Sequence, residues 1–140
     1  MPSKPFTLSA KVVILDKDGR CLLLRRSASS KAGAGKLDLP GGKVDAGEAF
    51  ESALRREVRE EAGLEVSLEQ VLGAAQSDLP DRRVAYLILE ASLASGEVCL
   101  SNEHTEYLWV ERASLAKMDL CPQFKAFAAA YARGGRGYST

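Results

Sequence analysis

The chain has 140 residues, of which 46% are hydrophobic, so it can bury one core without disulfides or structural metals, and we expect a single domain over residues 1–140. Nineteen basic residues balance nineteen acidic ones, which excludes a general field that attracts nucleic acid or an anionic membrane and favours a small-molecule partner. Three widely spaced cysteines exclude a zinc motif and a disulfide framework.

The beginning of the chain does not have the pattern of a targeting segment. The short apolar run after Met1–Pro5 is interrupted by the charged residues Asp16, Lys17 and Asp18, far short of a membrane span or a signal peptide. Together with the cysteine pattern, this predicts a cytoplasmic protein with no membrane partner and no stable nucleic acid partner. We expect it to be a monomer or a homodimer.

The first half of the chain predicts a hairpin, a loop and a helix. β-Branched and apolar residues predict strands over residues 6–15 and 21–24. Residues 27–36 are rich in Ser, Ala, Gly and Lys, which is typical of a surface loop. Residues 46–62 are helix-forming, and Gly63 stands where a helix end commonly takes a left-handed backbone.

The second half predicts more strands and a final helix. Apolar-rich segments predict strands over residues 71–75, 84–93, 98–100 and 107–110. The only histidine, His104, is expected in a solvated loop, and Trp109 is expected in the core. Helical spacing of apolar residues over 123–133 predicts a helix that packs on the sheet, and the tail at about 134–140 should be flexible. The result is an α/β layered domain with a mixed sheet.

Three glutamates share one side of the predicted central helix. Steps of three and four residues place Glu57, Glu60 and Glu61 within an arc of about 100°. A solvated charged face is the usual meaning of such a helix. Here, however, Phe50 and Leu54 lie on the same stripe, so the buried face should carry the acids into a cleft. Crowded carboxylates repel each other, and a hard divalent cation such as Mg²⁺ would make the cluster favourable.

Two glycine-containing segments precede this helix. The glycines of 41–47 allow main-chain N–H groups to approach an anionic ligand closely. Residues 31–36 look superficially like a phosphate-binding loop, but the glycine spacing of that motif is absent and Leu37 replaces its Ser or Thr. We therefore reject a phosphate-binding loop over residues 31–36.

The residues around the helix form a spaced motif. Glu48 follows Gly42 after five residues, and the run REVREEAGL, residues 56–64, follows after seven more. This pattern resembles the complete box of the Nudix family. The preceding Leu37–Gly42 and the later Trp109–Val110 are also similar to the family, so the resemblance extends over most of the chain.

The resemblance implies an α/β/α sandwich with a mixed sheet, in which the box forms a loop, a helix and a loop. It implies a catalytic site that binds Mg²⁺, or Mn²⁺ in its place, through three carboxylates and one glycine: Glu57, Glu60, Glu61 and Gly42. By the same resemblance, Glu48 and Arg56 brace the loop against the helix, although Glu48 could also approach a metal through water.

The expected reaction is water attack on a diphosphate linkage, with metal ions that bridge its oxygens and lower the pKa of the water. The proton acceptor is either a box glutamate such as Glu57 or an acid near Glu103 and Glu106. Strand alternation lets only one of Arg25 and Arg26 point inward. The substrate-contact candidates are Arg25, Arg26, Leu39, Gly41 and Lys43.

These features predict a Mg²⁺-dependent hydrolase of phosphorus-containing anhydrides with a nucleotide substrate. Nucleoside triphosphates, including oxidised purine forms, are the first substrate that we expect, because the chain is short and lacks an added substrate domain. Pro80 lies sixteen residues after Leu64, a spacing similar to that of family enzymes that act on ADP-ribose, so an ADP-ribose or nucleotide-sugar pyrophosphatase is the alternative. An alternative of another class is a nucleotide-sensing module without catalysis.

Overall fold

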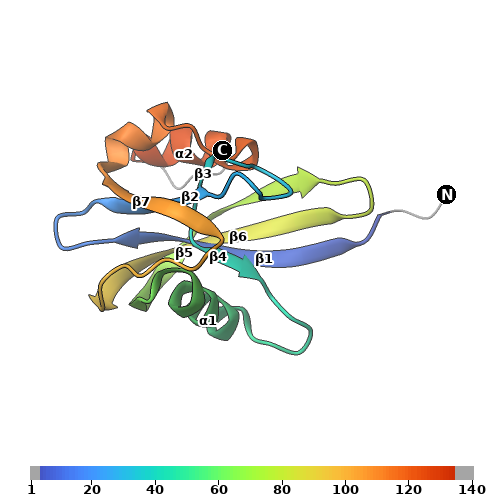
Figure 1. Ribbon diagram of the computed structural model, residues 1–140, viewed down its shortest axis with the longest axis horizontal. Helices are drawn as coiled ribbons and strands as arrows, with labels where there is room; N and C mark the ends of the chain where they lie inside the picture. The colour runs from blue at the N-terminus through green and yellow to red at the C-terminus, as the bar shows by residue number, and fades with distance from the viewer. Residues whose placement is uncertain (1–3, 135–140) are drawn as a thin grey trace.

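The computed structural model describes residues 4–134 as a mixed β-sheet with helices on both sides (Figure 1). The elements are β1 (Phe6–Leu15), β2 (Cys21–Arg26), β3 (Leu37–Asp38), β4 (Gly41–Lys43), α1 (Phe50–Ala62), β5 (Glu65–Asp78), β6 (Arg83–Ser95), β7 (His104–Val110), the 3₁₀ helices η1 (Arg112–Lys117) and η2 (Pro122–Phe124), and α2 (Lys125–Ala132).

Strand β1 is the centre of the sheet and organises the rest. The main strand order is β3-β2-β1-β6-β5, while β4 pairs with β1 and β7 pairs with β2. The β1–β6 pair is parallel over the whole length of β1, and the other pairs are antiparallel. The sheet is therefore mixed, as predicted. The short strand β4 leads directly from the edge of β1 toward α1.

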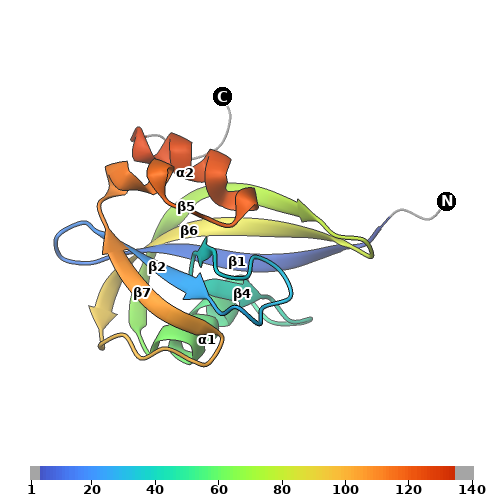
Figure 2. The same ribbon diagram turned by 45° about the horizontal axis from the view of Figure 1, so that its top comes forward.

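Side-chain alternation along β1 divides the core into two layers. Ala10, Val12 and Ile14 pack with Leu54 and Val58 of α1 on one face. On the other face, the alternate residues of β1 belong to a second cluster that also contains side chains of η2 and α2. The two helices thus cover opposite faces, which confirms the α/β/α sandwich (Figure 2).

Helix α1 begins later than the sequence predicts. Residues 46–49 do not join it but form a turn in which the Glu48 amide donates to the Asp45 carbonyl at 3.0 Å. The helix ends as expected: Gly63 has a φ of 70°, and its N–H donates to the Arg59 carbonyl at 3.0 Å. The late start leaves the segment before α1 free to make side-chain contacts with the helix.

The expected strand at 98–100 is wrong, and its true role is at the end of α1. The Cys99 N–H donates to the Ala62 carbonyl at 2.8 Å, and the Ser101 N–H donates to the Glu61 carbonyl at 3.2 Å. Carbonyls in the last turn of a helix lack partners within the helix, so this extended segment satisfies them. It therefore caps α1 and does not join the sheet.

Three further predictions concern the last third of the chain. His104 is buried at the start of β7, so its expected place in a solvated loop is wrong. Trp109 packs against the α1 side of the core, as expected. The predicted tail at about 134–140 lies outside the described residues, except for Gly134. Among the described helices, none is long and apolar enough to cross a membrane.

Candidate active site

A cleft of about 1000 Å³ lies between β1, β4, α1, the β5–β6 hairpin and the segment before α2. These elements are far apart in the sequence, and the sheet pairing brings them together. The charged side chains that line the cleft are Lys11, Arg26, Asp38, Lys43, Glu57, Glu61, Asp78, Arg82 and Glu103. The predicted helix therefore does aim carboxylates into a cleft.

Glu61 is the deepest carboxylate of the box. It lies one turn beyond Glu57 on α1, and only 7% of it is exposed. The Gly41 N–H donates to its Oε1 at 2.8 Å. Burial raises the pKa of Glu61 to about 7, against the opposing effects of nearby Lys11 and of the Gly41 hydrogen bond. The fold thus holds an acid where its ionised form is costly, which is typical of a functional site.

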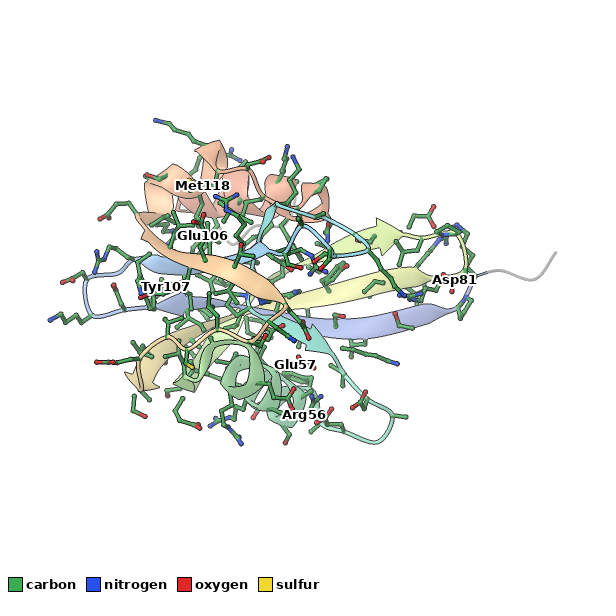
Figure 3. The ribbon with its side chains drawn as sticks, in the orientation of Figure 1. Arg56, Glu57, Asp81, Glu106, Tyr107 and Met118 are labelled. Atoms are coloured by element: carbon green, nitrogen blue, oxygen red, sulfur yellow. The ribbon has the colours of Figure 1, made fainter. Side chains whose placement is uncertain are left out.

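Glu57 lies beside β4, where the backbone approaches it closely. A Cβ atom at Gly42 would lie 2.9 Å from the Glu57 Cδ, so a side chain there would displace this carboxylate from its present position. The Arg56 Nη1 donates to the Glu57 Oε1 at 3.1 Å. Burial nevertheless raises the pKa of Glu57, and the neighbouring Glu60 and Glu103 charges add to the effect. Figure 3 shows Glu57 and Arg56 together on α1.

Glu60 differs from the other two acids. Its side chain is 60% exposed and does not line the cleft, although the Arg56 Nη1 lies 3.5 Å from its Oε2. The arc of about 100° that contains the three glutamates explains this difference, because Glu60 and Glu61 stand at its opposite ends. Within residues 4–134, no group of three or more His, Cys, Asp or Glu side chains is already arranged to hold a metal ion.

The donor set nevertheless suits a hard divalent cation. Glu57 and Glu61 supply carboxylate oxygens of the kind that Mg²⁺ prefers, and Gly42 lies against Glu57 in the lining of the same cleft. Residues 5–131 match the NUDIX domain family. The chain belongs to the Nudix family. It is a Nudix pyrophosphohydrolase of the MutT-like kind, and enzymes of this family generally use a divalent metal.

Known relatives agree with this assignment. Nucleoside triphosphatase NudI from Salmonella agona is 32% identical over 118 residues, which cover 76% of this chain and 84% of that protein. The crystal structure of MutT protein from Methanosarcina mazei Go1 has a TM-score of 0.86 and 34% identity, and the match covers 96% of this chain and 98% of that one. The E. coli ORF135 protein has a TM-score of 0.80 and 25% identity, over 94% and 93% of the two chains.

Glu48 and Arg56 make the bracing contact expected of this Nudix box. The Arg56 Nε donates to the Glu48 Oε2 and its Nη2 donates to the Glu48 Oε1, both at 3.0 Å. The Glu48 Oε1 also accepts the Asp45 N–H at 3.2 Å, which fixes the turn before α1. This two-point hydrogen bond holds the pKa of Glu48 below its ordinary value. Arg56 thereby links the turn to Glu57 in the cleft.

The candidate substrate contacts divide into two groups. Arg26, Gly41 and Lys43 line the cleft. Arg25 does not line it, because its guanidinium pairs with the Glu106 carboxylate and donates to the Gly35 carbonyl. Leu39 is only 3% exposed and belongs to the core, so its placement among the substrate contacts is wrong. As predicted, only one of the two adjacent arginines points inward.

Glu103 and Glu106, the two candidate bases outside the box, differ in position. Glu103 lines the cleft and is close enough to Glu57 to raise its pKa. Glu106 does not line it and is paired with Arg25 on the outer part of β7. In Figure 3, Glu106 lies on β7, well away from Glu57 on α1. Of the two, only Glu103 is placed to act in the cleft.

Sequence reasoning missed the buried polar pair on the cleft floor. The Lys11 ammonium lies 3.3 Å from the Asp38 Oδ2, and both side chains are less than a tenth exposed. Arg26 pairs with the same oxygen at 3.0 Å. A signal was present in the sequence, because Lys11 interrupts an otherwise apolar half of a strand. Its partner could not have been named from that signal alone.

Proposed function

We propose that this Nudix hydrolase cleaves nucleoside triphosphates at a diphosphate linkage, with Mg²⁺ bound by the box glutamates. The observation that carries the proposal is the convergence of Glu57 and Glu61, both with raised pKa, beside Gly42 at one end of a large cleft. The relative named a nucleoside triphosphatase supports this substrate class. An oxidised purine is one form of base that such a substrate could carry.

The residues that would hold the metal are Glu57, Glu61 and the Gly42 carbonyl, with Glu60 at the rim as the third carboxylate. Bound Mg²⁺, or Mn²⁺ in its place, would neutralise charge on the diphosphate oxygens and lower the pKa of a water. Lys43 is exposed at the cleft beside these acids and is placed to contact a phosphate. Arg26 is already paired with Asp38 and has less freedom to do so.

We assign the proton transfer to Glu103. Its carboxylate lines the cleft and makes no hydrogen bond or ion pair with residues 4–134, whereas that of Glu57 is held by Arg56. A Glu103 carboxylate oxygen takes one proton of the attacking water as the new O–P bond forms. The bridging P–O bond breaks with its electron pair on the bridging oxygen, and the products are a nucleoside monophosphate and inorganic pyrophosphate.

A second candidate function is hydrolysis of ADP-ribose or a nucleotide sugar. The cleft continues past the acids to the β5–β6 hairpin, where Leu79, next to Pro80, and Arg82 line it. Ser77 and Tyr86, hydrogen-bonded to each other at 3.1 Å, add polar groups at this end. A substrate with a second sugar beyond the diphosphate would reach them.

The test is a panel of nucleoside triphosphates, ADP-ribose, nucleotide sugars and dinucleoside polyphosphates with Mg²⁺, followed by product analysis. Gln replacements of Glu57, Glu61 and Glu103 should lower turnover by about 100-fold or more. Glu106→Gln is the matched control and should retain wild-type turnover. Near-wild-type turnover of all three variants at saturating Mg²⁺ would refute the proposed site. Binding of a nucleotide without turnover of any compound would support the sensing module.

A further inference from the structure

The mechanism does not use Lys11, although it is the one buried lysine among residues 4–134. Its Nζ donates to the Leu39 carbonyl at 3.1 Å and to the Gly41 carbonyl at 3.0 Å, and the Asp38 Oδ2 lies at 3.3 Å. An ammonium group has three N–H donors, and these three acceptors occupy all of them. Lys11 therefore has no donor left for a substrate.

The two carbonyls that Lys11 binds flank a single peptide unit. The Leu39 carbonyl belongs to the peptide before Pro40, and the Gly41 carbonyl belongs to the peptide before Gly42. The peptide between them is fixed at both ends: the Pro40 carbonyl accepts the Val12 N–H at 3.0 Å, and the Gly41 N–H donates to Glu61. Three successive peptides are thus held in one orientation.

The same segment is pressed onto β1. Gly41 has a φ of 120°, and a Cβ atom there would lie 2.1 Å from the Ala10 carbonyl oxygen. Such a close approach gives the backbone little freedom on the β1 side. Lys11, which follows Ala10 in β1, reaches around to the carbonyls on the cleft side. The segment is held from both sides by adjacent residues of one strand.

We propose that Lys11 is a positioning residue that locks residues 38–41, so that Gly41 and Gly42 hold Glu61 and Glu57 in the arrangement that binds the metal. This inference rests on the proposed function, because it assigns the metal to those glutamates. The segment contacts both acids: Gly41 through the hydrogen bond to Glu61, and Gly42 through its close packing against Glu57. Partners that orient metal ligands typically change metal affinity by about 10- to 100-fold when they are replaced.

The decisive variant is Lys11→Met, which keeps an unbranched side chain only one heavy atom shorter but removes the three donors. Asp38 does not lose its last partner, because Arg26 remains 3.0 Å from its Oδ2. The matched control is Lys17→Met, the same replacement in the exposed turn after β1. Asp38→Asn is a graded comparison, since it removes the charge of one Lys11 partner and leaves both carbonyl contacts.

Two readouts apply: Mn²⁺ affinity by calorimetry, and the amide resonance of Gly41 by NMR, both at a temperature where all proteins are folded. We expect Lys11→Met to bind Mn²⁺ at least about 10-fold more weakly and to shift the Gly41 resonance. Lys17→Met should change neither, and Asp38→Asn should change Mn²⁺ affinity less than Lys11→Met. If Lys11→Met does not fold, the polar and uncharged Lys11→Gln undergoes the same measurements with the same expected direction.

The outcomes separate this inference from the proposed function. Wild-type protein that binds no Mn²⁺ and hydrolyses no nucleotide would remove the proposed function and this inference with it. Wild-type protein that binds Mn²⁺, together with a folded Lys11 variant of equal affinity and an unchanged Gly41 resonance, would overturn the role of Lys11 alone. An Asp38→Asn variant as weak as Lys11→Met would also overturn it, because the acid would then be the decisive group.

Discussion

Replacing Glu61 with Gln should lower turnover by about 100-fold or more and yet stabilise the metal-free protein. Glu61 is almost completely buried, and burial raises the pKa of its carboxyl to about 7 from an ordinary value of 4.5. Gln has nearly the same shape and can still accept the Gly41 N–H, but it carries no charge. The variant therefore removes the cost of an ionised acid in the core and keeps the local hydrogen bond.

The magnitude follows from the pKa difference. The native state holds the Glu61 proton to a higher pH than the unfolded chain, so the stability linked to this proton is present below about pH 4.5 and lost as the pH rises to about 7. Each pKa unit corresponds to about 1.4 kcal/mol, so the loss reaches about 3 kcal/mol at about pH 8. Glu61→Gln does not suffer this loss.

The assay is urea unfolding with a metal chelator at about pH 4 and about pH 8, with Glu51→Gln in the exposed first turn of α1 as the control. The variant and wild type should differ little at the lower pH, and the variant should be more stable by about 3 kcal/mol at the higher one. Added Mg²⁺ should stabilise wild type more than the variant, because the metal binds the native state. A variant that is less stable than wild type at about pH 8 without metal would refute the reasoning.

Two further substitutions test the loop that leads into α1. Gly41→Ala should destabilise the protein by about 2–4 kcal/mol in urea unfolding, because its Cβ would overlap the Ala10 carbonyl. The control is Gly47→Ala: Gly47 has a φ of 79°, but an added Cβ meets nothing within 4 Å, so this variant should cost only about 1–2 kcal/mol. Equal losses of stability in the two variants would contradict the close approach of Gly41 to β1. Arg56→Lys should raise the Mg²⁺ concentration needed for half-maximal turnover by about 10-fold, because an ammonium group cannot bind both oxygens of Glu48 as the guanidinium does. An unchanged Mg²⁺ dependence would show that the Arg56–Glu48 contact does not act on the site.

The central part of the site could be predicted from the sequence because it lies on one helix. Helical geometry converts the spacing of Glu57 and Glu61 directly into a shared face, and the apolar residues on that face indicate which side is buried. The same reasoning could not rank Glu60, because an arc of about 100° spans both the cleft and the rim. Its side chain is 60% exposed, and that exposure depends on how α1 packs in the fold, which the helix sequence does not specify.

The contacts between strands could not be predicted in this way. Lys11 meets Asp38 only because β3 and β4 return to β2 and β1 in a particular register. Residues 98–100 have the apolar composition of a strand, yet Cys99 bonds to the end of α1 because the carbonyls there lack partners. The sequence pattern indicates which residues are buried, but the contact partner of each buried residue depends on which strands and helix ends pair in the folded protein.

The charges of the cleft explain why this arrangement needs a cation. Glu57, Glu61 and Glu103 lie at one end of the cleft. The nearby Lys11 ammonium donates its three N–H groups to Asp38 and to two backbone carbonyls. The positive charge of Lys11 offsets part of the negative charge of Asp38 and Glu61, but Lys11 has no donor left for a hydrogen bond to a phosphate. Arg56 and Lys43 offset these carboxylates only in part, because the Glu103 carboxylate forms no ion pair with residues 4–134, so an anionic phosphate would still be repelled at this end. A divalent ion reverses that repulsion at the point where the diphosphate must lie, so metal binding and substrate binding should reinforce each other.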